Sequence, residues 1–144
     1  DTIGRALPTQ ASGSGVERAR HEVALVSNGR YSVMSTAAGA GSSSWQDLDV
    51  TRWREDATRD CWGQFLYVRD LNDGAIWSIG HQPLCGAMAD YQVAFHADRA
   101  EFRRRDAEIE TRLAICVSPD QDEEVRLVTL INHDARPPLL DPPS

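Results

Sequence analysis

The feature that most constrains the fold is a two-residue alternation of apolar and polar side chains, which recurs in short runs along the chain. In residues 109–117, every second side chain is apolar or threonine. Successive side chains of a β-strand point to opposite faces of a sheet, so this pattern predicts a half-buried strand. After a turn at Ser118-Pro119-Asp120, the same period begins again, which predicts that the next strand presents its own apolar face through Val125, Leu127, Thr129 and Ile131.

Turn signals between such runs predict antiparallel hairpins. Asn28-Gly29 separates two runs, 23–26 and 31–36, and Asn-Gly between alternating runs is a strong hairpin signal. A second pair of runs is joined by a connection that ends in Gly74, where glycine allows the positive φ of a tight turn. Antiparallel neighbours are therefore expected throughout the chain.

A third pair of strands is predicted in the second half of the chain. Residues 91–96 alternate, and after a turn at Asp98 residues 100–105 form a candidate return strand with Phe102 inward. The outward side chains of the return strand are expected to be Glu101, Arg103 and Arg105. We interpret the whole run Arg103-Arg104-Arg105 as a solvated strand face.

The predicted fold class is all-β, an antiparallel β-sandwich or part of one, with little helix. No segment of ten or more residues keeps a 3.6-residue period. Residues 1–21 contain Pro8 and a Gly/Ser run and are expected to form a flexible linker. Residues 22–134 are expected to form the sandwich, and residues 135–144, with four prolines, a Pro-rich tail.

Charge and hydropathy exclude several classes of protein. The 144 residues carry 15 basic and 22 acidic side chains, and every basic one is arginine. With a net charge of −7, and acidic residues on both sides of Arg103-Arg104-Arg105, nucleic acid is not an expected partner. No apolar run approaches the ~20 residues that cross a bilayer, so direct membrane insertion is not expected either.

The three cysteines, Cys61, Cys85 and Cys116, are widely separated and lack a Cys-x-x-Cys pair. This usage implies neither a disulfide framework nor a structural zinc site. We expect a reducing compartment, the cytoplasm, with a single Cys61–Cys85 bridge as the alternative.

Motifs for catalysis, metals and cofactors are not recognised in the sequence. The four histidines lie far apart in unrelated settings, and no nucleophile elbow, phosphate loop or zinc motif occurs. Asp47-Leu48-Asp49 resembles a metal-binding Asp-x-Asp pair, but the all-β setting argues against that interpretation. We therefore predict no catalytic residue, no metal and no cofactor, and whether the chain is an enzyme stays open.

One segment stands apart in composition, between residues 45 and 62, where three of the four tryptophans lie among arginines and carboxylates. Aromatic rings cover the C–H faces of sugars, while guanidinium and carboxylate groups hydrogen-bond the hydroxyls. The alternative is that the rings plug an open end of the sandwich while Arg–carboxylate pairs hold the loop. The candidates for carbohydrate binding or for a domain interface are Trp45, Arg52, Trp53, Arg54, Glu55, Asp56, Asp60 and Trp62.

Several runs of residues carry a family resemblance. They are Leu25 to Met34, Gly39-x-Gly41, Trp45, Val50-Thr51-Arg52-Trp53-Arg54-Glu55-Asp56-Ala57-Thr58-Arg59-Asp60-x-Trp62-Gly63, Tyr67-x-Arg69-Asp70 and Trp77-Ser78. Over residues 22–133 the chain resembles the N-terminal β-supersandwich domain of glycoside hydrolase family 94. The version that it most resembles lies in the C-terminal region of cyclic β-1,2-glucan synthases, and cellobiose and chitobiose phosphorylases are more distant relatives.

The resemblance implies a carbohydrate-associated module. In the family, an α-helical barrel follows the supersandwich and carries the catalytic acid, and this chain does not include it. The implied role is glucan binding, or support of a glycan-processing catalytic domain, without catalysis by the isolated chain. The alternative is a structural module that docks on a helical barrel and binds no sugar. Open sheet edges imply a homo-oligomer.

This sequence departs from the family pattern in one loop. Where the family shows Gly-Gly-Gly-Tyr-Ser-Arg-Trp, the chain has Gly39-Ala40-Gly41-Ser42-Ser43-Ser44-Trp45. The loop lacks an aromatic ring and a cation that the family pattern has. If the loop binds a sugar or a neighbouring domain, that binding is expected to be weaker here.

Overall fold

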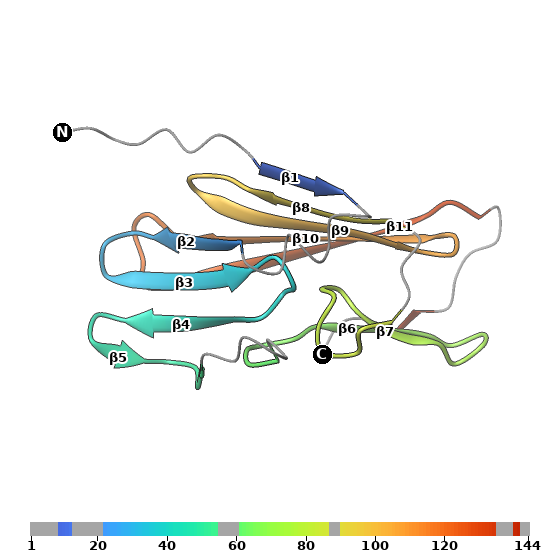
Figure 1. Cartoon of the computed structure of the whole chain (residues 1–144), viewed down its shortest axis with the longest axis horizontal. Helices are drawn as coiled ribbons and strands as arrows, with labels where there is room; N and C mark the ends of the chain where they lie inside the picture. The colour runs from blue at the N-terminus through green and yellow to red at the C-terminus, as the bar shows by residue number, and fades with distance from the viewer. Residues whose placement is uncertain (1–8, 13–21, 55–60, 87–89, 135–139, 142–144) are drawn as a thin grey trace.

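The computed structural model of the chain describes residues 9–12, 22–54, 61–86, 90–134 and 140–141. Within these residues every regular element is a β-strand, and the strands form three antiparallel sheets. The all-β, antiparallel prediction is confirmed. Figure 1 shows the largest sheet along the upper part of the molecule, with β2 to β5 stacked at the left and β6 and β7 at the lower right.

The largest sheet has five strands in the order β1-β8-β9-β10-β11. Its strands are β1 (Thr9–Ser12), β8 (Asp90–Phe95), β9 (Arg99–Asp106), β10 (Ile109–Val117) and β11 (Glu124–Asn132). Strands β8 to β11 follow one another as hairpins, with Val93 opposite Phe102, Phe102 opposite Leu113, and Leu113 opposite Val128.

Two smaller sheets complete the described structure. The four-stranded sheet contains β2 (Val23–Ser27), β3 (Tyr31–Thr36), β4 (Gly41–Trp45) and β5 (Leu48–Asp49) in chain order. The three-stranded sheet has the order β12-β6-β7, with β12 (Leu140–Asp141), β6 (Tyr67–Asp70) and β7 (Ile76–Ser78). Both hairpins predicted from Asn28-Gly29 and Gly74 are confirmed, and Gly29 and Gly74 adopt φ of 91° and 77°.

The core lies where the inner faces of the sheets meet, and strands β2 and β3 pack against β9 and β10. Apolar burial is the main stabilising term at such a contact. Hydrogen bonds also cross between the sheets: the Tyr91 hydroxyl donates to the Ala37 carbonyl oxygen at 2.7 Å, and Trp77 Nε1 donates to Thr111 Oγ1 at 3.3 Å. The buried apolar side chains include Val33, Val68, Trp77, Val93, Phe102 and Leu113.

The predicted apolar face of β11 is wrong. Val125, Leu127 and Thr129 point outward, and the first two are 46% and 63% exposed. Val128 and Leu130 pack against the core instead. Strand β11 carries apolar side chains at both odd and even positions, so alternation alone does not select its inner face. The register with β10 makes that selection.

The prediction that Arg104 is solvated is also wrong. Its neighbours Arg103 and Arg105 point outward as expected, but Arg104 lies on the same face as Phe102 and is 2% exposed. Its guanidinium pairs with both carboxylate oxygens of Asp106, at 2.5 and 2.7 Å, and donates to the Ser78 carbonyl oxygen at 2.8 Å. The two-residue period of the strand directs this cation inward, and the hydrogen bonds to Asp106 and Ser78 satisfy it.

Two short strands occur in the segments predicted to be a linker and a tail. Strand β1 pairs with β8, and β12 pairs with β6. Strands this short attach to a sheet edge through backbone hydrogen bonds and need no apolar alternation. The remaining residues of 1–21 and 135–144 lie outside the described part of the chain, so these boundaries stay predictions.

Candidate functional site

The tryptophan-rich segment begins at the β4–β5 hairpin, at the lower left of Figure 1. Trp45 and Leu48 are cross-strand partners on either side of a tight turn. After β5 the chain is tied back to β4, because the backbone N–H groups of Val50 and Thr51 both donate to the Ser43 carbonyl oxygen, at 2.9 and 3.2 Å. The Thr51 hydroxyl accepts from the Ser43 N–H at 2.8 Å. The backbone just before Arg52 is thereby held against β4.

Two arginines and a tryptophan form the central cluster of the segment. The guanidinium carbons of Arg52 and Arg54 lie 5.7 and 5.9 Å from the centre of the Trp62 ring. Both distances are within the range of a cation–π interaction. Both arginines are exposed, whereas Trp62 is half-buried. The exposed N–H groups of the two guanidinium groups can therefore reach a ligand.

Close backbone packing places Trp62 beside β4. The Gly41 N–H donates to the Trp62 carbonyl oxygen at 3.0 Å. A Cβ atom at Gly41 would lie 2.2 Å from the Met34 carbonyl oxygen, and one at Gly63 would lie 2.7 Å from the Gly41 nitrogen. Gly41 thus permits the close approach of β4 to β3, and Gly63 permits the close approach of its own backbone to Gly41.

Trp45 is held by a different set of contacts. Its indole N–H donates to Asp122 Oδ2 at 2.7 Å, and Arg30 Nε donates to Asp122 Oδ1 at 2.6 Å. These two hydrogen bonds lower the pKa of the Asp122 carboxyl group. The Trp45 side chain is therefore fixed by the turn that joins β10 and β11, and 38% of it remains exposed.

The surface around the segment is both aromatic and aliphatic. Trp53 is 36% exposed, while Leu48 and Val50 are 61% and 54% exposed. Exposed apolar clusters next to charged groups are typical of interaction surfaces. We call Trp45, Leu48, Val50, Arg52, Trp53, Arg54 and Trp62 the Trp–Arg surface.

The structure describes five of the eight residues predicted for the site. Arg52, Arg54 and Trp62 come together, Trp53 is exposed between the two arginines in sequence, and Trp45 binds Asp122. The three predicted carboxylates, Glu55, Asp56 and Asp60, lie outside the described residues.

A second polar cluster, which the sequence did not predict, lies on the outer face of the five-stranded sheet. Glu110 accepts from Arg103 at 2.9 and 3.1 Å, from Arg112 Nε at 2.6 Å, and lies 3.1 Å from His133 Nε2. These side chains cover Glu110, which is 1% exposed although it faces away from the core. The feature that could have revealed this cluster is the register of the β9–β10 hairpin. It places Arg103 opposite Arg112, and both next to Glu110.

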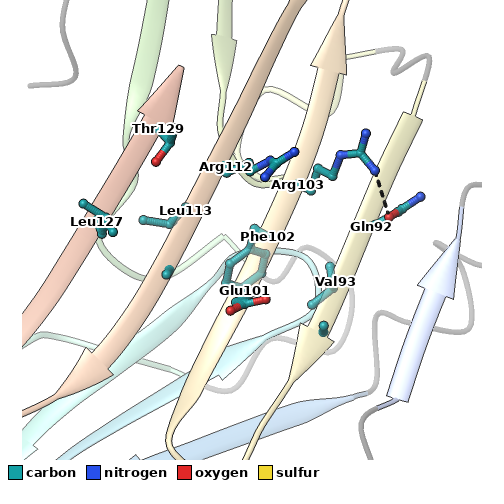
Figure 2. Close-up of a pocket in the computed structure, with 11 residues that line it drawn as sticks. Gln92, Val93, Glu101, Phe102, Arg103, Arg112, Leu113, Leu127 and Thr129 are labelled. Carbon is teal, nitrogen blue, oxygen red and sulfur yellow. Dashed lines mark hydrogen bonds between the residues drawn. The ribbon is translucent and has the colours of Figure 1, made fainter. Parts of the chain in front are cut away.

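A groove of about 440 Å³ runs across the same face (Figure 2). The groove has space because the small side chains of Ala94 and Ala114 lie on either side of Glu101 on the neighbouring strands. Arg103 and Gln92 form one wall and are joined by a hydrogen bond of 3.5 Å, drawn as a dashed line in Figure 2. The other side chains that contribute to its outer rim include Arg112, Leu127 and Thr129.

The Glu110 cluster makes stability depend on pH. Hydrogen bonds from Arg103, Arg112 and His133 lower the Glu110 pKa from 4.5 to about 2. A group whose pKa is lower in the folded state stabilises the fold above its unfolded pKa, and this stabilisation is lost as the pH falls toward the folded value. We therefore expect the free energy of unfolding to fall between about pH 5 and pH 2. Urea unfolding at a series of pH values measures this slope.

Glu110→Gln is expected to reduce that acid slope, because glutamine does not titrate. Glu123→Gln removes an exposed carboxylate from the β10–β11 turn and controls for the change in net charge. Parallel pH profiles for the wild type and Glu110→Gln would contradict the assignment.

The described residues supply few elements of metal or redox chemistry. Cys61, Cys85 and Cys116 are free thiols. Within the part of the chain that the structure describes, no three His, Cys, Asp or Glu side chains come together in a way that could hold a metal ion. The same residues contain no helix of the length and apolarity that membrane crossing requires.

Comparison with known proteins adds family information to this geometry. Over 111 residues, 77% of its length, the chain is 37% identical to the cyclic β-(1,2)-glucan synthase NdvB of Rhizobium meliloti (strain 1021), and spans 4% of that protein. Over 85 residues, 58% of its length, it is 32% identical to the N,N'-diacetylchitobiose phosphorylase of Vibrio proteolyticus, and spans 11% of it. The model of the glycosyl hydrolase 94 supersandwich domain matches residues 11–141. The chain belongs to the glycosyl hydrolase 94 supersandwich domain family.

Proposed function

We propose that this chain is a non-catalytic accessory domain of a larger glycan-processing protein, and that its Trp–Arg surface binds a β-1,2-linked glucan. The observation that carries the proposal is the exposure of the Trp45 and Trp53 indole rings, each by more than a third, in a segment that also exposes the guanidinium groups of Arg52 and Arg54. The similarity to a cyclic β-(1,2)-glucan synthase supports this choice of glucan.

The surface has the chemistry that a sugar chain requires. An exposed indole ring covers the C–H face of a pyranose, and a guanidinium group donates several hydrogen bonds in a fixed plane to ring hydroxyls. Arg52 and Arg54 lie over the Trp62 ring, which limits their motion before a ligand arrives. Limiting this motion lowers the entropy lost on binding.

Two carboxylates on the outer face of the five-stranded sheet, Glu101 in the groove and Glu110 in the polar cluster, support a non-catalytic role. Glycoside cleavage requires a carboxylic acid that is protonated when it meets the leaving group. Glu101 accepts a hydrogen bond from Arg99, which lowers the Glu101 pKa, and three partners lower the Glu110 pKa. Both groups are ionised near neutral pH and cannot supply that proton. We assign the chemistry to another part of the longer protein.

A second candidate function is docking of the Trp–Arg surface on a catalytic domain, such as a helical barrel, with no sugar bound. The observation that favours it is the exposure of Leu48 and Val50, which lie between Trp45 and Trp53 in the sequence. Aliphatic side chains form no hydrogen bonds with hydroxyls, whereas aromatic, aliphatic and arginine side chains together suit a protein interface.

A fluorescence titration tests glucan binding. Addition of β-1,2-glucan oligosaccharides to the 144-residue chain is expected to change the tryptophan emission. Trp53→Ala is expected to weaken binding at least tenfold, which corresponds to about 1.4 kcal/mol. The buried Trp77 contributes constant emission to both proteins.

Leu48→Ala is the matched control, since it shortens an exposed side chain on the same surface without removing a ring or a cation. It is expected to leave the glucan affinity within twofold. No spectral change at millimolar glucan would exclude glucan binding and favour the docking function.

A further inference from the structure

Strand β11 is the end strand of the five-stranded sheet, and it is long for an edge. It runs for nine residues, Glu124–Asn132, and contains neither proline nor lysine. Among the described residues it pairs with β10 on one side, and no strand pairs with its other side. Exposed sheet edges usually carry features that prevent pairing with a further strand, such as proline, lysine or a bulge.

The hydrogen bonds at the two ends of β11 determine which backbone groups face the open edge. The Ser118 N–H donates to the Glu123 carbonyl oxygen, and the His133 N–H donates to the Glu108 carbonyl oxygen. Both pairs continue the β10–β11 register. In an antiparallel ladder, bonded and non-bonded pairs alternate. The odd-numbered residues of β11 therefore bond to β10, and the open edge presents the N–H and C=O groups of Glu124, Arg126, Val128 and Leu130.

The side chains of β11 show that this edge is accessible. Val125 and Leu127, on the outer face, are 46% and 63% exposed. Val128 and Leu130 face the core but are only half-buried. A long edge with exposed apolar side chains favours pairing with a further strand.

We propose that β11 is a dimerisation edge, at which two copies of this chain pair their β11 strands antiparallel about a two-fold axis through Val128. This register aligns all nine residues. It also places the backbone N–H and C=O groups at the open edge of one copy opposite those of the other copy, as the hydrogen bonds of an antiparallel ladder require. The two five-stranded sheets then form one continuous sheet.

The proposed register is self-complementary. Val128 lies opposite its own copy, Leu127 lies opposite Thr129, and Val125 lies opposite Ile131. Arg126 faces Leu130 and Glu124 faces Asn132, so no pair brings like charges together. Register shifts that centre the axis on Arg126 or on Glu124 would place two like charges directly opposite each other, which destabilises a sheet.

Charge also makes a second copy a suitable occupant of the edge. The two charged residues of β11 already neutralise each other, since Arg126 Nε donates to Glu124 Oε1 at 2.7 Å. Glu124 further accepts from Ser43 and from Tyr31. Because its two charges are paired within the strand, β11 has no unpaired charge that would attract an oppositely charged partner. A second, identical β11 strand can therefore pair with it without charge repulsion.

Sedimentation equilibrium tests the proposal directly. The 16.0 kDa chain is expected to reach twice that mass as its concentration rises from low to high micromolar. A monomer across that whole range would overturn the proposal. That result would leave the edge to a strand from elsewhere in a longer protein.

Charge-exchange variants test the strand and its register. The double variant Leu127→Glu with Thr129→Glu places carboxylates opposite each other in the dimer, and Leu127→Lys with Thr129→Lys does the same with ammonium groups. Each variant alone is expected to be monomeric, and an equimolar mixture is expected to regain the dimer mass. Both positions are exposed, so the fold should persist, which far-ultraviolet circular dichroism checks.

The matched control is the double variant Val23→Glu with Leu25→Glu on strand β2. The Val23 side chain is 54% exposed and the Leu25 side chain is 68% exposed. It is expected to dimerise as the wild type does. Dimers that persist in the β11 glutamate variant, a β2 variant that is monomeric, or a mixture that stays monomeric would each overturn the assignment to β11.

Discussion

Arg104→Met is expected to lower the free energy of unfolding by about 3–5 kcal/mol, the range for breaking a buried ion pair at one partner. Methionine has a similar length but no donor. It would leave the Asp106 carboxylate and the Ser78 carbonyl oxygen without the guanidinium that now binds both. The Gly80 carbonyl oxygen, which accepts from Arg104 at 3.3 Å, would lose the same donor.

The adjacent cation supplies a matched control for Arg104. Arg105→Met on the same strand removes an exposed guanidinium that binds the Ala107 carbonyl oxygen and Glu108. Surface substitutions of this kind change stability by about 0.5 kcal/mol or less. Urea unfolding of the wild type and both variants, followed by circular dichroism, measures the difference. Equal stabilities for the two variants would show that the hydrogen bonds from Arg104 to Ser78 and Gly80 do not stabilise the fold.

Gly41→Ala is the second substitution with a large expected effect. The new Cβ atom would lie 2.2 Å from the Met34 carbonyl oxygen and 3.2 Å from the Ser35 Cα. Both are backbone atoms of β3, so the β3–β4 pair must separate to accept the methyl group. Overpacking costs about 1–3 kcal/mol and occasionally more. We expect a loss of about 3 kcal/mol in the free energy of unfolding.

A glycine with room around it controls for the change of residue type. A Cβ atom at Gly86 would have its nearest contact 3.7 Å away, at the far end of the Arg104 side chain. Gly86→Ala is expected to change stability by less than about 0.5 kcal/mol. Thermal unfolding by calorimetry compares the two variants. Equal melting temperatures would contradict the close approach of β3 and β4 that places Trp62.

Of the two substitutions, only Gly41→Ala is expected to change how the Trp–Arg surface is held. Gly41 also donates to the Trp62 carbonyl oxygen, so separation of β3 and β4 would shift the ring over which Arg52 and Arg54 lie. Arg104 is distant from this surface in sequence and acts through the core. Gly41→Ala is therefore expected to weaken glucan binding in the protein that remains folded, whereas Arg104→Met mainly reduces the folded fraction.

Much of the fold could be predicted from local patterns. Asn28-Gly29 and Gly74 determine their hairpins because the turn conformation depends on a few adjacent residues. The outward direction of Arg103 and Arg105 follows from a period of two about Phe102. The aromatic and basic composition of residues 45–62 identified the candidate surface, of which the structure describes Trp45, Arg52, Trp53, Arg54 and Trp62.

The remaining features depend on residues that are far apart in the chain. The inner face of β11 is selected by its register with β10, because both of its faces carry apolar residues. The Glu110 cluster joins side chains from β9, from β10 and from the residue after β11. Local composition contains no information on which strands become neighbours, so these contacts could not be predicted from it.

The sequence by itself determined the strands, the hairpins and the kinds of side chain available for binding, because backbone alternation and turn chemistry are local properties. Only the tertiary structure decided that Arg104 is buried, that β11 exposes Leu127, and that Trp62 lies beneath two arginines. Those outcomes depend on strand register and on the close approach of glycine backbones, which arise when distant segments pack together.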